Sequence, residues 1–275
     1  MIKLHIMTSV RLALFLCDSP MPAVQETDGD YTAIFSALLQ NSSPSTHFVL
    51  DPYDVRHKQE YPEDVDQYQG IILTGSAASA YENLGWINWL MSYIASIAES
   101  KPHIKLLGIC FGHQIISRAL GSECIPNTAG WEVGITPVGL TETGRQIFGA
   151  DILNIQQMHR DHIPQVPKSC HLLGSTSVCP NQGYIRFIPG SASARAQTPP
   201  SLSNPQVWKD IQIFTVQGHP EFTKSIVAKM VDAREGNGVL NSEIVTGARE
   251  RADWRNDGVS VIGKVMWRIL GVATV

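Results

Sequence analysis

The sequence feature that most constrains the fold is the stretch at residues 105–121, which reads KLLGICFGHQIISRALG. It opens as a short apolar run, passes through a tight segment in which two glycines flank Cys110, and continues with apolar residues at helical spacing. Gly121 stands where the C-cap of a helix is expected. The stretch therefore predicts a strand, a sharp turn and a helix, with Cys110 in the turn.

This order of elements is the geometry of a nucleophile elbow, in which a Ser or Cys sits on a strained turn at the end of a strand. Gly108 and Gly112 are the residue type that such a turn needs, because it brings the backbone close to neighbouring elements. The following helix points its positive N-terminal end at Cys110, which favours a thiolate. The alternative is a buried core cysteine beside a strand, which the two flanking glycines disfavour.

Residues 211–222, IQIFTVQGHPEF, supply a base for this nucleophile. The alternating apolar run predicts a strand, and His219 lies just past its end, where a parallel sheet presents functional groups at its carboxyl edge. Glu221, two residues on, can orient the imidazole and stabilise its charged form. The order Cys110, His219, Glu221 on an alternating α/β chain therefore predicts a nucleophilic triad in which a thiolate attacks.

The motifs GICFGHQ and QGHPEF together resemble those of the class I glutamine amidotransferase family, and the resemblance runs over most of the chain. Within that family, TGSAASAYENLGWINWL and the later MHRDHI are most similar to the stand-alone fungal and plant members, which include the plant γ-glutamyl peptidases. The resemblance implies Cys110 as nucleophile, His219 as base and Glu221 as third member, the same residues that spacing and chemistry indicate. It adds a substrate class, compounds that carry a γ-glutamyl amide.

A second turn, at residues 74–76, ends a predicted strand at the same sheet edge as Cys110. A small, glycine-containing turn can present free backbone N–H groups, which an oxyanion hole requires when a carbonyl carbon becomes tetrahedral. The N–H of Phe111, directly after the nucleophile, would be the partner donor. The resemblance implies Gly75 and Ser76 for this role, while the residues alone leave an ordinary strand-to-loop turn open.

The resemblance also implies residues that contact the substrate. Gln114, one turn into the helix after Cys110, matches a family position that contacts the glutamyl group; the residues alone allow a plain helix-surface glutamine. His159 and Asp161 fall in a loop that lines the glutamyl pocket in the family, where it would meet the substrate amino group. His159 and His162 could instead suggest a metal site, but no third ligand stands nearby in the sequence.

Charge and composition set aside several classes of protein. The chain has 275 residues, of which 43% are hydrophobic and 17% charged, as is ordinary for a globular protein. Its net charge of −4 gives no basic field for nucleic acid, and no run approaches the roughly twenty apolar residues of a membrane span. The apolar N-terminal segment could be a signal peptide, but Arg11 interrupts it, and we interpret it as a buried strand that ends at Asp18.

The five cysteines, an odd number without paired spacing, predict neither a disulfide framework nor a zinc ligand set. Cys170, His171 and Cys179 in particular have the wrong spacing for a chelating knuckle. We therefore expect free thiols, a reducing cytoplasmic compartment, and no metal or other cofactor.

Buried strands and amphipathic helices alternate along the chain, which predicts a single doubly wound α/β fold with a mostly parallel, flavodoxin-like sheet. Residues 132–155 alternate as antiparallel strands do and predict a small antiparallel extension. No repeat or linker divides the chain, so we expect one domain over residues 1–275. Helices are expected at residues 30–40, 86–97, 225–233, 242–253 and 257–270.

The expected chemistry is acyl transfer, in which Cys110 attacks the δ-carbonyl of a γ-glutamyl group and water then releases glutamate. A γ-glutamyl peptidase acting on glutathione or its conjugates needs no partner and is the preferred hypothesis, since the sequence shows no synthetase domain or P-loop. Two alternatives stay open: a glutaminase subunit that delivers ammonia to a separate biosynthetic enzyme, and a non-hydrolytic protein that uses the scaffold for binding. Residues 189–205, rich in Ser, Pro and Ala, predict an irregular loop that we expect to border the leaving-group side of Cys110.

Overall fold

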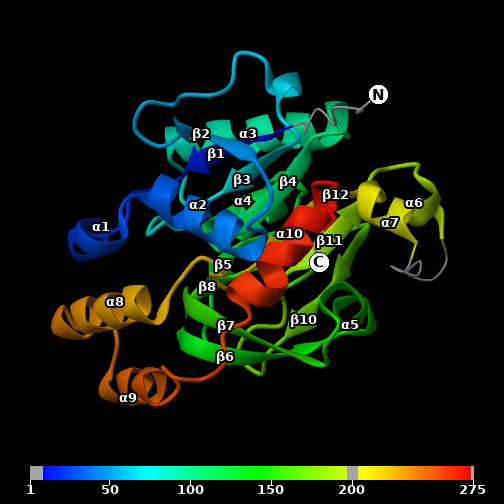
Figure 1. Cartoon of the computed structure of the whole chain (residues 1–275). Coiled ribbons are helices and arrows are strands. Elements are labelled where there is room, and N and C mark those ends of the chain that lie inside the picture. Colours follow the sequence, from blue (N-terminus) through cyan, green and yellow to red (C-terminus); the bar gives the residue numbers. More distant parts are fainter. Residues whose placement is uncertain (1–8, 197–203, 274–275) are drawn as a thin grey trace.

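The computed structural model describes residues 9–196 and 204–273. Its centre is a seven-stranded sheet that contains, in spatial order, β2 (Phe48–Asp54), β1 (Val10–Leu16), β3 (Gly70–Leu73), β4 (Lys105–Ile109), β12 (Ile211–Val216), β11 (Tyr184–Phe187) and β9 (Cys170–Leu172) (Figure 1). The first five strands run parallel, and the last two continue the sheet in the antiparallel sense. The parallel strands follow a flavodoxin-like order, so the predicted fold class is confirmed.

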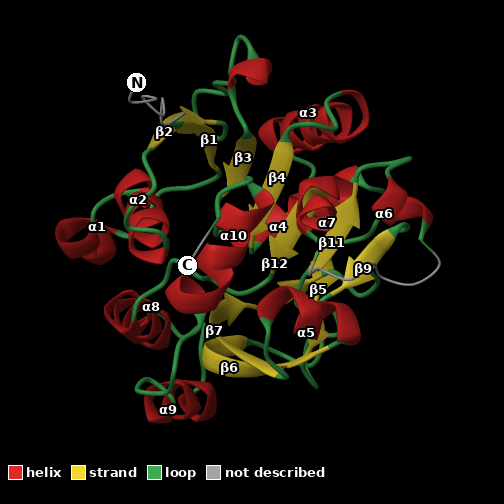
Figure 2. Cartoon of the chain, turned by 45° about the vertical axis from the view of Figure 1, so that its right-hand side comes forward, coloured by secondary structure: helices red, strands yellow, loops and turns green. Residues whose placement is uncertain are grey.

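Helices cover both faces of this sheet (Figure 2). The helices in the described part of the chain are α1 (Pro22–Asp28), α2 (Tyr31–Ser42), α3 (Gly85–Ser100), α4 (Phe111–Ala119), α5 (Glu142–Phe148), α6 (Ala192–Arg195), α7 (Pro205–Asp210), α8 (Lys224–Gly236), α9 (Ser242–Glu250) and α10 (Lys264–Ile269). Because side chains alternate between the faces along a strand, Leu12 of β1 belongs to the core that includes α2 and α10, whereas Phe15 belongs to the core that includes α3 and α4. The cores on the two faces therefore fix the sheet between two helical layers.

A small antiparallel sheet extends the fold. It consists of β10 (Gly174–Ser175), β6 (Glu132–Leu140) and β7 (Ile152–His159), and beside it β5 (Ile125–Pro126) pairs with β8 (Asp161–His162). The extension was predicted over residues 132–155, and β7 runs four residues further, to His159. A bridge between Gln156 and His219 joins β7 to the segment after β12. This contact brings the end of β7 to the carboxyl edge of the parallel strands.

The C-terminal helical region differs from the single helix predicted at residues 257–270. It begins as a π-helical turn, η2 (Gly258–Gly263), and continues as α10. A Cβ on Gly258 would lie 2.9 Å from the carbonyl carbon of Pro220, so this backbone passes directly against the segment that carries His219. The sequence does not predict β9 and β11, which are too short to show a clear alternation, or the 3₁₀ turn η1 (Val65–Gln67).

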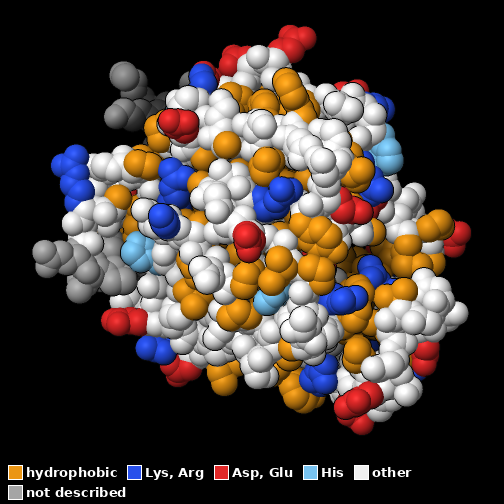
Figure 3. All heavy atoms as spheres, turned by 180° about the vertical axis from the view of Figure 1, so that it is seen from behind, with side chains coloured by type: hydrophobic (Ala, Val, Ile, Leu, Met, Phe, Trp, Pro, Cys, Tyr) orange, Lys and Arg blue, Asp and Glu red, His pale blue; other side chains and the backbone are white. Residues whose placement is uncertain are grey.

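The surface carries charges of both signs. On the face seen in Figure 3, Lys and Arg side chains are scattered among acidic, polar and apolar ones and do not form one continuous basic field. This distribution agrees with a net charge of −4. Within residues 9–196 and 204–273, none of the helices combines the length and apolar character needed to cross a bilayer.

Candidate active site

The turn between β4 and α4 has the strained geometry of a nucleophile elbow. Cys110 adopts a φ of 52° and a ψ of −104°, a region that L side chains rarely occupy, and its N–H donates to Val216 O at 3.0 Å. A Cβ on Gly112 would overlap the carbonyl oxygen of Leu73, and a Cβ on Gly108 would lie 2.7 Å from the Gly112 carbonyl carbon. Only glycine therefore fits on either side of the turn, for the reason that the sequence suggests.

The chain after β12 places His219 beside Cys110. His219 Nδ1 donates to Glu221 Oε1 at 2.8 Å, and the imidazole stacks on Phe222 with ring centroids 3.9 Å apart and planes 2° apart. The bond to Glu221 leaves the other ring nitrogen available to exchange a proton with the Cys110 side chain, which lines the same cavity as the ring. Cys110, His219 and Glu221 are all buried, so the structure brings the three residues of the predicted triad together in one group.

The charges around His219 favour its protonated form. Burial of the ring lowers the pKa of His219, but the negative charges of Cys110 and Glu221, together with the hydrogen bond to Glu221, outweigh this effect and raise the pKa to about 10. At neutral pH the raised pKa keeps the imidazole of His219 positively charged, between the Cys110 side chain and the Glu221 side chain. This is the arrangement that a cysteine nucleophile with a histidine partner requires.

The turn after β3 lies against this group. A Cβ on Gly75 would come 2.9 Å from His219 Cε1 and 3.7 Å from Cys110 Cβ, so a larger residue would press on the imidazole. Within the described part of the chain, the backbone N–H groups of Gly75, Ser76 and Phe111 donate to no protein acceptor. The donors expected for an oxyanion hole are therefore unengaged, and their role in stabilising an oxyanion stays a prediction.

Asp18, two residues after the end of β1, holds the turn that carries Gly75. Its Oδ2 accepts from Ala77 N–H at 2.7 Å and from Ser76 Oγ at 3.2 Å, and its Oδ1 pairs with Arg56 Nη1 at 2.5 Å. Reasoning from the sequence identified Asp18 only as the end of a strand. The place of Asp18 in the sequence could have indicated a role in the site, because a carboxylate after the first parallel strand lies at the edge where doubly wound folds bind their ligands.

Gln114, His159 and Asp161 line one hollow together with Cys110. Gln114 is buried, and its Nε2 donates to the carbonyl oxygen of Asp161 at 2.9 Å, so the alternative of a plain helix-surface glutamine is wrong. Asp161 Oδ2 accepts from Ser79 Oγ at 2.6 Å. The structure thus gathers the three residues expected to bind substrate into one wall, and their contact with a substrate remains a prediction.

His159 belongs to a buried cluster of polar side chains. Its Nε2 faces Glu132 Oε2 at 3.0 Å, and its Nδ1 faces a main-chain carbonyl oxygen at 3.1 Å, so each ring nitrogen has an oxygen partner. Glu132 also accepts from Thr176 and Gln182, each at 2.6 Å. With Cys179, Glu132 and His159 form a group whose ligand atoms lie within 4.8 Å of one another, the one such group among the described residues. Because hydrogen bonds already engage Glu132 and His159, this cluster is explained as a support for the site wall.

Two cavities open at Cys110. Both are lined by Cys110 and by Ser76, Ala77, Met158 and Arg234. The polar cavity, about 340 Å³ in volume, is completed mainly by Ser79, Gln114, Trp131, His159, Arg160 and Asp161. The apolar cavity, about 390 Å³ in volume, is completed by His219 and mainly by Val24, Tyr31, Ile34, Phe222, Ile226 and Met230. His219 therefore faces the apolar cavity and does not line the polar one.

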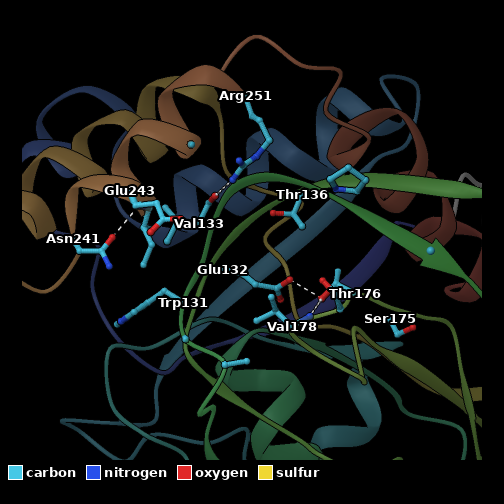
Figure 4. Close-up of a pocket in the computed structure, with 17 residues that line it drawn as sticks. Trp131, Glu132, Val133, Thr136, Ser175, Thr176, Val178, Asn241, Glu243 and Arg251 are labelled. Carbon is cyan, nitrogen blue, oxygen red and sulfur yellow. Dashed lines mark hydrogen bonds between the residues drawn. The ribbon is translucent and has the colours of Figure 1, made fainter.

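A third hollow, an open groove of about 1020 Å³, runs between β6 and α9 (Figure 4). Arg251 reaches across it and donates to the carbonyl oxygens of Val133 at 2.9 Å and Ile135 at 2.8 Å. These bonds engage a stretch of β6 that β10 does not cover, which protects an open strand edge. Trp131 lines both this groove and the polar cavity, and Cys110 does not reach the groove.

The described part of the predicted loop, residues 189–196 and 204–205, lies away from the position that we expect. In its described part, Ser193 in α6 donates to Asp210 at 2.6 Å, and no residue of that part lines either cavity at Cys110. Residues 197–203 lie outside the described residues. A segment that precedes β12 meets the amino end of that strand, whereas His219 follows its carboxyl end. For the described part, the expectation that this loop borders the leaving-group side is therefore wrong.

Comparison with known proteins places this site in a wider group. Residues 31–186 match the family described as glutamine amidotransferase class-I. The chain is 36% identical over 249 residues to a putative glutamine amidotransferase-like protein of Schizosaccharomyces pombe, a match that covers 88% of this chain and 91% of that protein. It is 28% identical over 244 residues to gamma-glutamyl peptidase 3 of Arabidopsis thaliana, covering 86% and 84%. The crystal structure of a glutamine amidotransferase from Thermotoga maritima shares the fold, with a TM-score of 0.65 and 16% identity over 96% of this chain and 99% of that one.

Proposed function

The chain belongs to the class-I glutamine amidotransferase family, and we propose that it hydrolyses γ-glutamyl amide bonds with Cys110 as nucleophile, His219 as general acid and base, and Glu221 as the residue that orients His219. The observation that carries this proposal is the buried group itself. His219 bonds to Glu221 at 2.8 Å and lies beside Cys110, at a turn onto which two cavities open. Nucleophile, base and orienting carboxylate are the parts that covalent acyl transfer requires.

In the first half of the reaction, the Cys110 thiolate attacks the δ-carbonyl carbon of the γ-glutamyl group, and the carbonyl oxygen takes up the negative charge. The N–H groups of Gly75 or Ser76 and of Phe111 stabilise that oxyanion. His219 then gives its proton to the amide nitrogen as the carbon–nitrogen bond breaks. The amine leaves, and the glutamyl group remains bound to Cys110 as a thioester.

In the second half, His219 is neutral and takes a proton from a water molecule that attacks the thioester carbon. The carbon–sulfur bond breaks, glutamate leaves, and Cys110 returns to the thiolate beside a protonated His219. Glu221 keeps the same ring nitrogen of His219 protonated through both halves, so that the other nitrogen alone exchanges protons with the reactants.

We favour γ-glutamyl peptides such as glutathione or its conjugates as substrates over free glutamine. The relatives from Arabidopsis thaliana that are named gamma-glutamyl peptidases support this choice, at 26–28% identity. The apolar cavity supports it as well, because His219 lines that cavity and ammonia would leave a space of about 390 Å³ unused.

The second candidate is a glutaminase subunit that supplies ammonia to a separate biosynthetic enzyme. The fungal relatives, which are named as putative glutamine amidotransferases or amidotransferase-like proteins, favour it. This candidate uses the same triad and the same thioester, and it differs in the leaving group and in the need for a partner protein.

The test is to incubate the pure protein with glutamine, glutathione and a glutathione S-conjugate and to follow the release of glutamate. We expect faster release from the γ-glutamyl peptides than from glutamine, and no release with Cys110→Ala, whose melting temperature should stay close to that of the parent. Faster release from glutamine would support the second candidate. Equal release by Cys110→Ala would refute the proposed nucleophile.

A further inference from the structure

Arg234, near the C-terminal end of α8, is a positive charge that the proposed reaction does not use. It lines both the polar and the apolar cavity, beside Cys110 in each. Its guanidinium carbon lies 5.1 Å from the centroid of the Trp131 ring, which fixes the group by a cation–π contact. Burial lowers the pKa of Arg234, and the negative charge of Cys110 counteracts part of that effect.

No carboxylate in the described part of the chain pairs with Arg234. The acidic residues nearest to it along α8, Asp232 and Glu235, both pair with Arg249, at 2.7 and 2.6 Å. Asp18 also lines the apolar cavity, but it pairs with Arg56. A basic residue in the last turn of a helix is common. That preference does not explain why this guanidinium lies against an aromatic ring, lines two cavities and has no anionic partner in the described part of the chain. These surroundings leave the guanidinium of Arg234 able to bind an anion that is not part of the chain.

The position of His219 decides which cavity receives the leaving group. His219 must reach the departing nitrogen to protonate it, and His219 lines the apolar cavity only. The polar cavity, with Gln114 and Asp161 in its wall, is left for the glutamyl group. The leaving group therefore enters a space that is apolar at its centre and has Arg234 at the point where the two cavities meet.

We propose that Arg234 binds the free carboxylate of a departing amino acid or short peptide and that the apolar cavity receives its apolar side chain, so that the preferred substrates are γ-glutamyl compounds whose leaving group carries both a carboxylate and a large apolar group. This inference rests on the proposed hydrolysis and adds the class of leaving group. The apolar wall formed by Val24, Ile34, Phe222 and Ile226 would cover a phenylalanine or leucine side chain. The N–Cα–carboxylate geometry of an amino acid puts a negative charge close to the nitrogen that His219 protonates, in the cavity that Arg234 also lines.

The experiment compares three substrates that share the glutamyl group. γ-Glutamylphenylalanine has both the ring and the carboxylate, γ-glutamylphenethylamide has the ring alone, and γ-glutamylglycine has the carboxylate alone. The parent protein should prefer the first over the second by about tenfold to a hundredfold in kcat/KM, the worth of a hydrogen-bonded charge pair. It should prefer the first over the third by about tenfold, from burial of the ring.

The variant is Arg234→Met, and the matched control is Arg249→Met, which removes an arginine of the neighbouring helix that lines neither cavity. Arg234→Met should lose most of the preference for γ-glutamylphenylalanine over γ-glutamylphenethylamide, chiefly through a higher KM, and should change the rate on the amide less than about threefold. Arg249→Met should keep the preference. An equal loss on all three substrates would overturn the inference, because it would mean that Arg234 binds the carboxylate of the glutamyl group.

Binding separates this inference from the proposed hydrolysis. In a Cys110→Ala background, calorimetry should show tighter binding of γ-glutamylphenylalanine than of γ-glutamylphenethylamide, and the difference should vanish when Arg234→Met is added. If the parent releases no glutamate from any substrate but this difference in binding is present, the proposed hydrolysis is wrong and the binding site is right. If the two compounds bind equally, the inference about Arg234 is wrong, whatever the rates of hydrolysis.

Discussion

Replacing Gly75 with alanine tests the geometry around His219 most directly. Gly75 has no unusual φ, so alanine can adopt its backbone conformation, and the added methyl group is the whole perturbation. That methyl group would lie 2.9 Å from His219 Cε1. The imidazole has little room to withdraw, because it stacks on Phe222 at 3.9 Å and is bonded to Glu221 at 2.8 Å.

The expected size of the effect follows from these distances. Ordinary van der Waals contact begins at 3.4 Å, so the ring of His219 or the turn at Gly75 must move by about half an ångström. A misplacement of about 1 Å can cost a hundredfold in rate, and half of it should cost about tenfold, or about 1.4 kcal/mol in the activation barrier. The same crowding should lower the free energy of unfolding by about 1–3 kcal/mol.

The assay is kcat/KM for a γ-glutamyl substrate, measured well below the unfolding transition, with Gly236→Ala as the matched control. A Cβ on Gly236 would meet nothing within 4 Å, and this residue lies in α8, so alanine should leave activity unchanged and raise the stability by up to about 1 kcal/mol. If Gly75→Ala has full activity and unchanged stability, the contact between the turn and the imidazole does not exist in solution, and the placement of the oxyanion donors falls with it.

Three further predictions use the same site. Glu221→Gln should move the alkaline limb of the kcat profile to lower pH: the raised pKa of about 10 keeps His219 protonated up to that pH, and Glu221 is one of the charges that raise it. An unmoved limb would show that Glu221 does not control His219. Asp18→Ala should lower kcat about tenfold with little change in KM, since it frees the turn that carries the oxyanion donors; a change confined to KM would assign Asp18 to binding instead. Gly112→Ala should reduce the free energy of unfolding, measured by urea titration, by about 1–3 kcal/mol, because its Cβ overlaps the carbonyl oxygen of Leu73, although alanine is the better helix former. A more stable Gly112→Ala protein would contradict the tight packing of the elbow.

The elbow and the order of the parallel strands could be predicted from the sequence because local rules determine them. Gly108 and Gly112 mark a turn that no other residue fits, and His219 follows an apolar run of strand length. Parallel strands present their carboxyl ends at one edge, so residues that follow different strands must meet there. Cys110 and His219 are far apart in the sequence, yet this rule alone brings them together.

The rest of the site depends on contacts between distant segments that no local pattern records. Gln114 could be a surface residue on its helix, and only the packing of β8 against α4 turns it inward to bond with Asp161. The loop at residues 189–205 shows the reverse error, because nearness in sequence to the strand that carries His219 suggested nearness in space. A strand has two ends, and the described part of this loop lies near the amino end of β12, whereas His219 follows its carboxyl end.

The residues that we expect to carry out the reaction follow strands, whereas the residue that we expect to select the leaving group lies on a helix. Cys110, His219 and Gly75 all follow strands of one sheet, so the sheet fixes their mutual positions. Arg234 instead lies on α8. An ion pair at 2.8 Å between Lys229 of α8 and Asp28 of α1 joins two helices that both line the apolar cavity. Because α1 and α8 form walls of that cavity without supplying the nucleophile, substitutions there can alter the accepted leaving group while the triad stays intact. Relatives that share the triad and differ along α8 should therefore share the reaction and differ in the amine that they release.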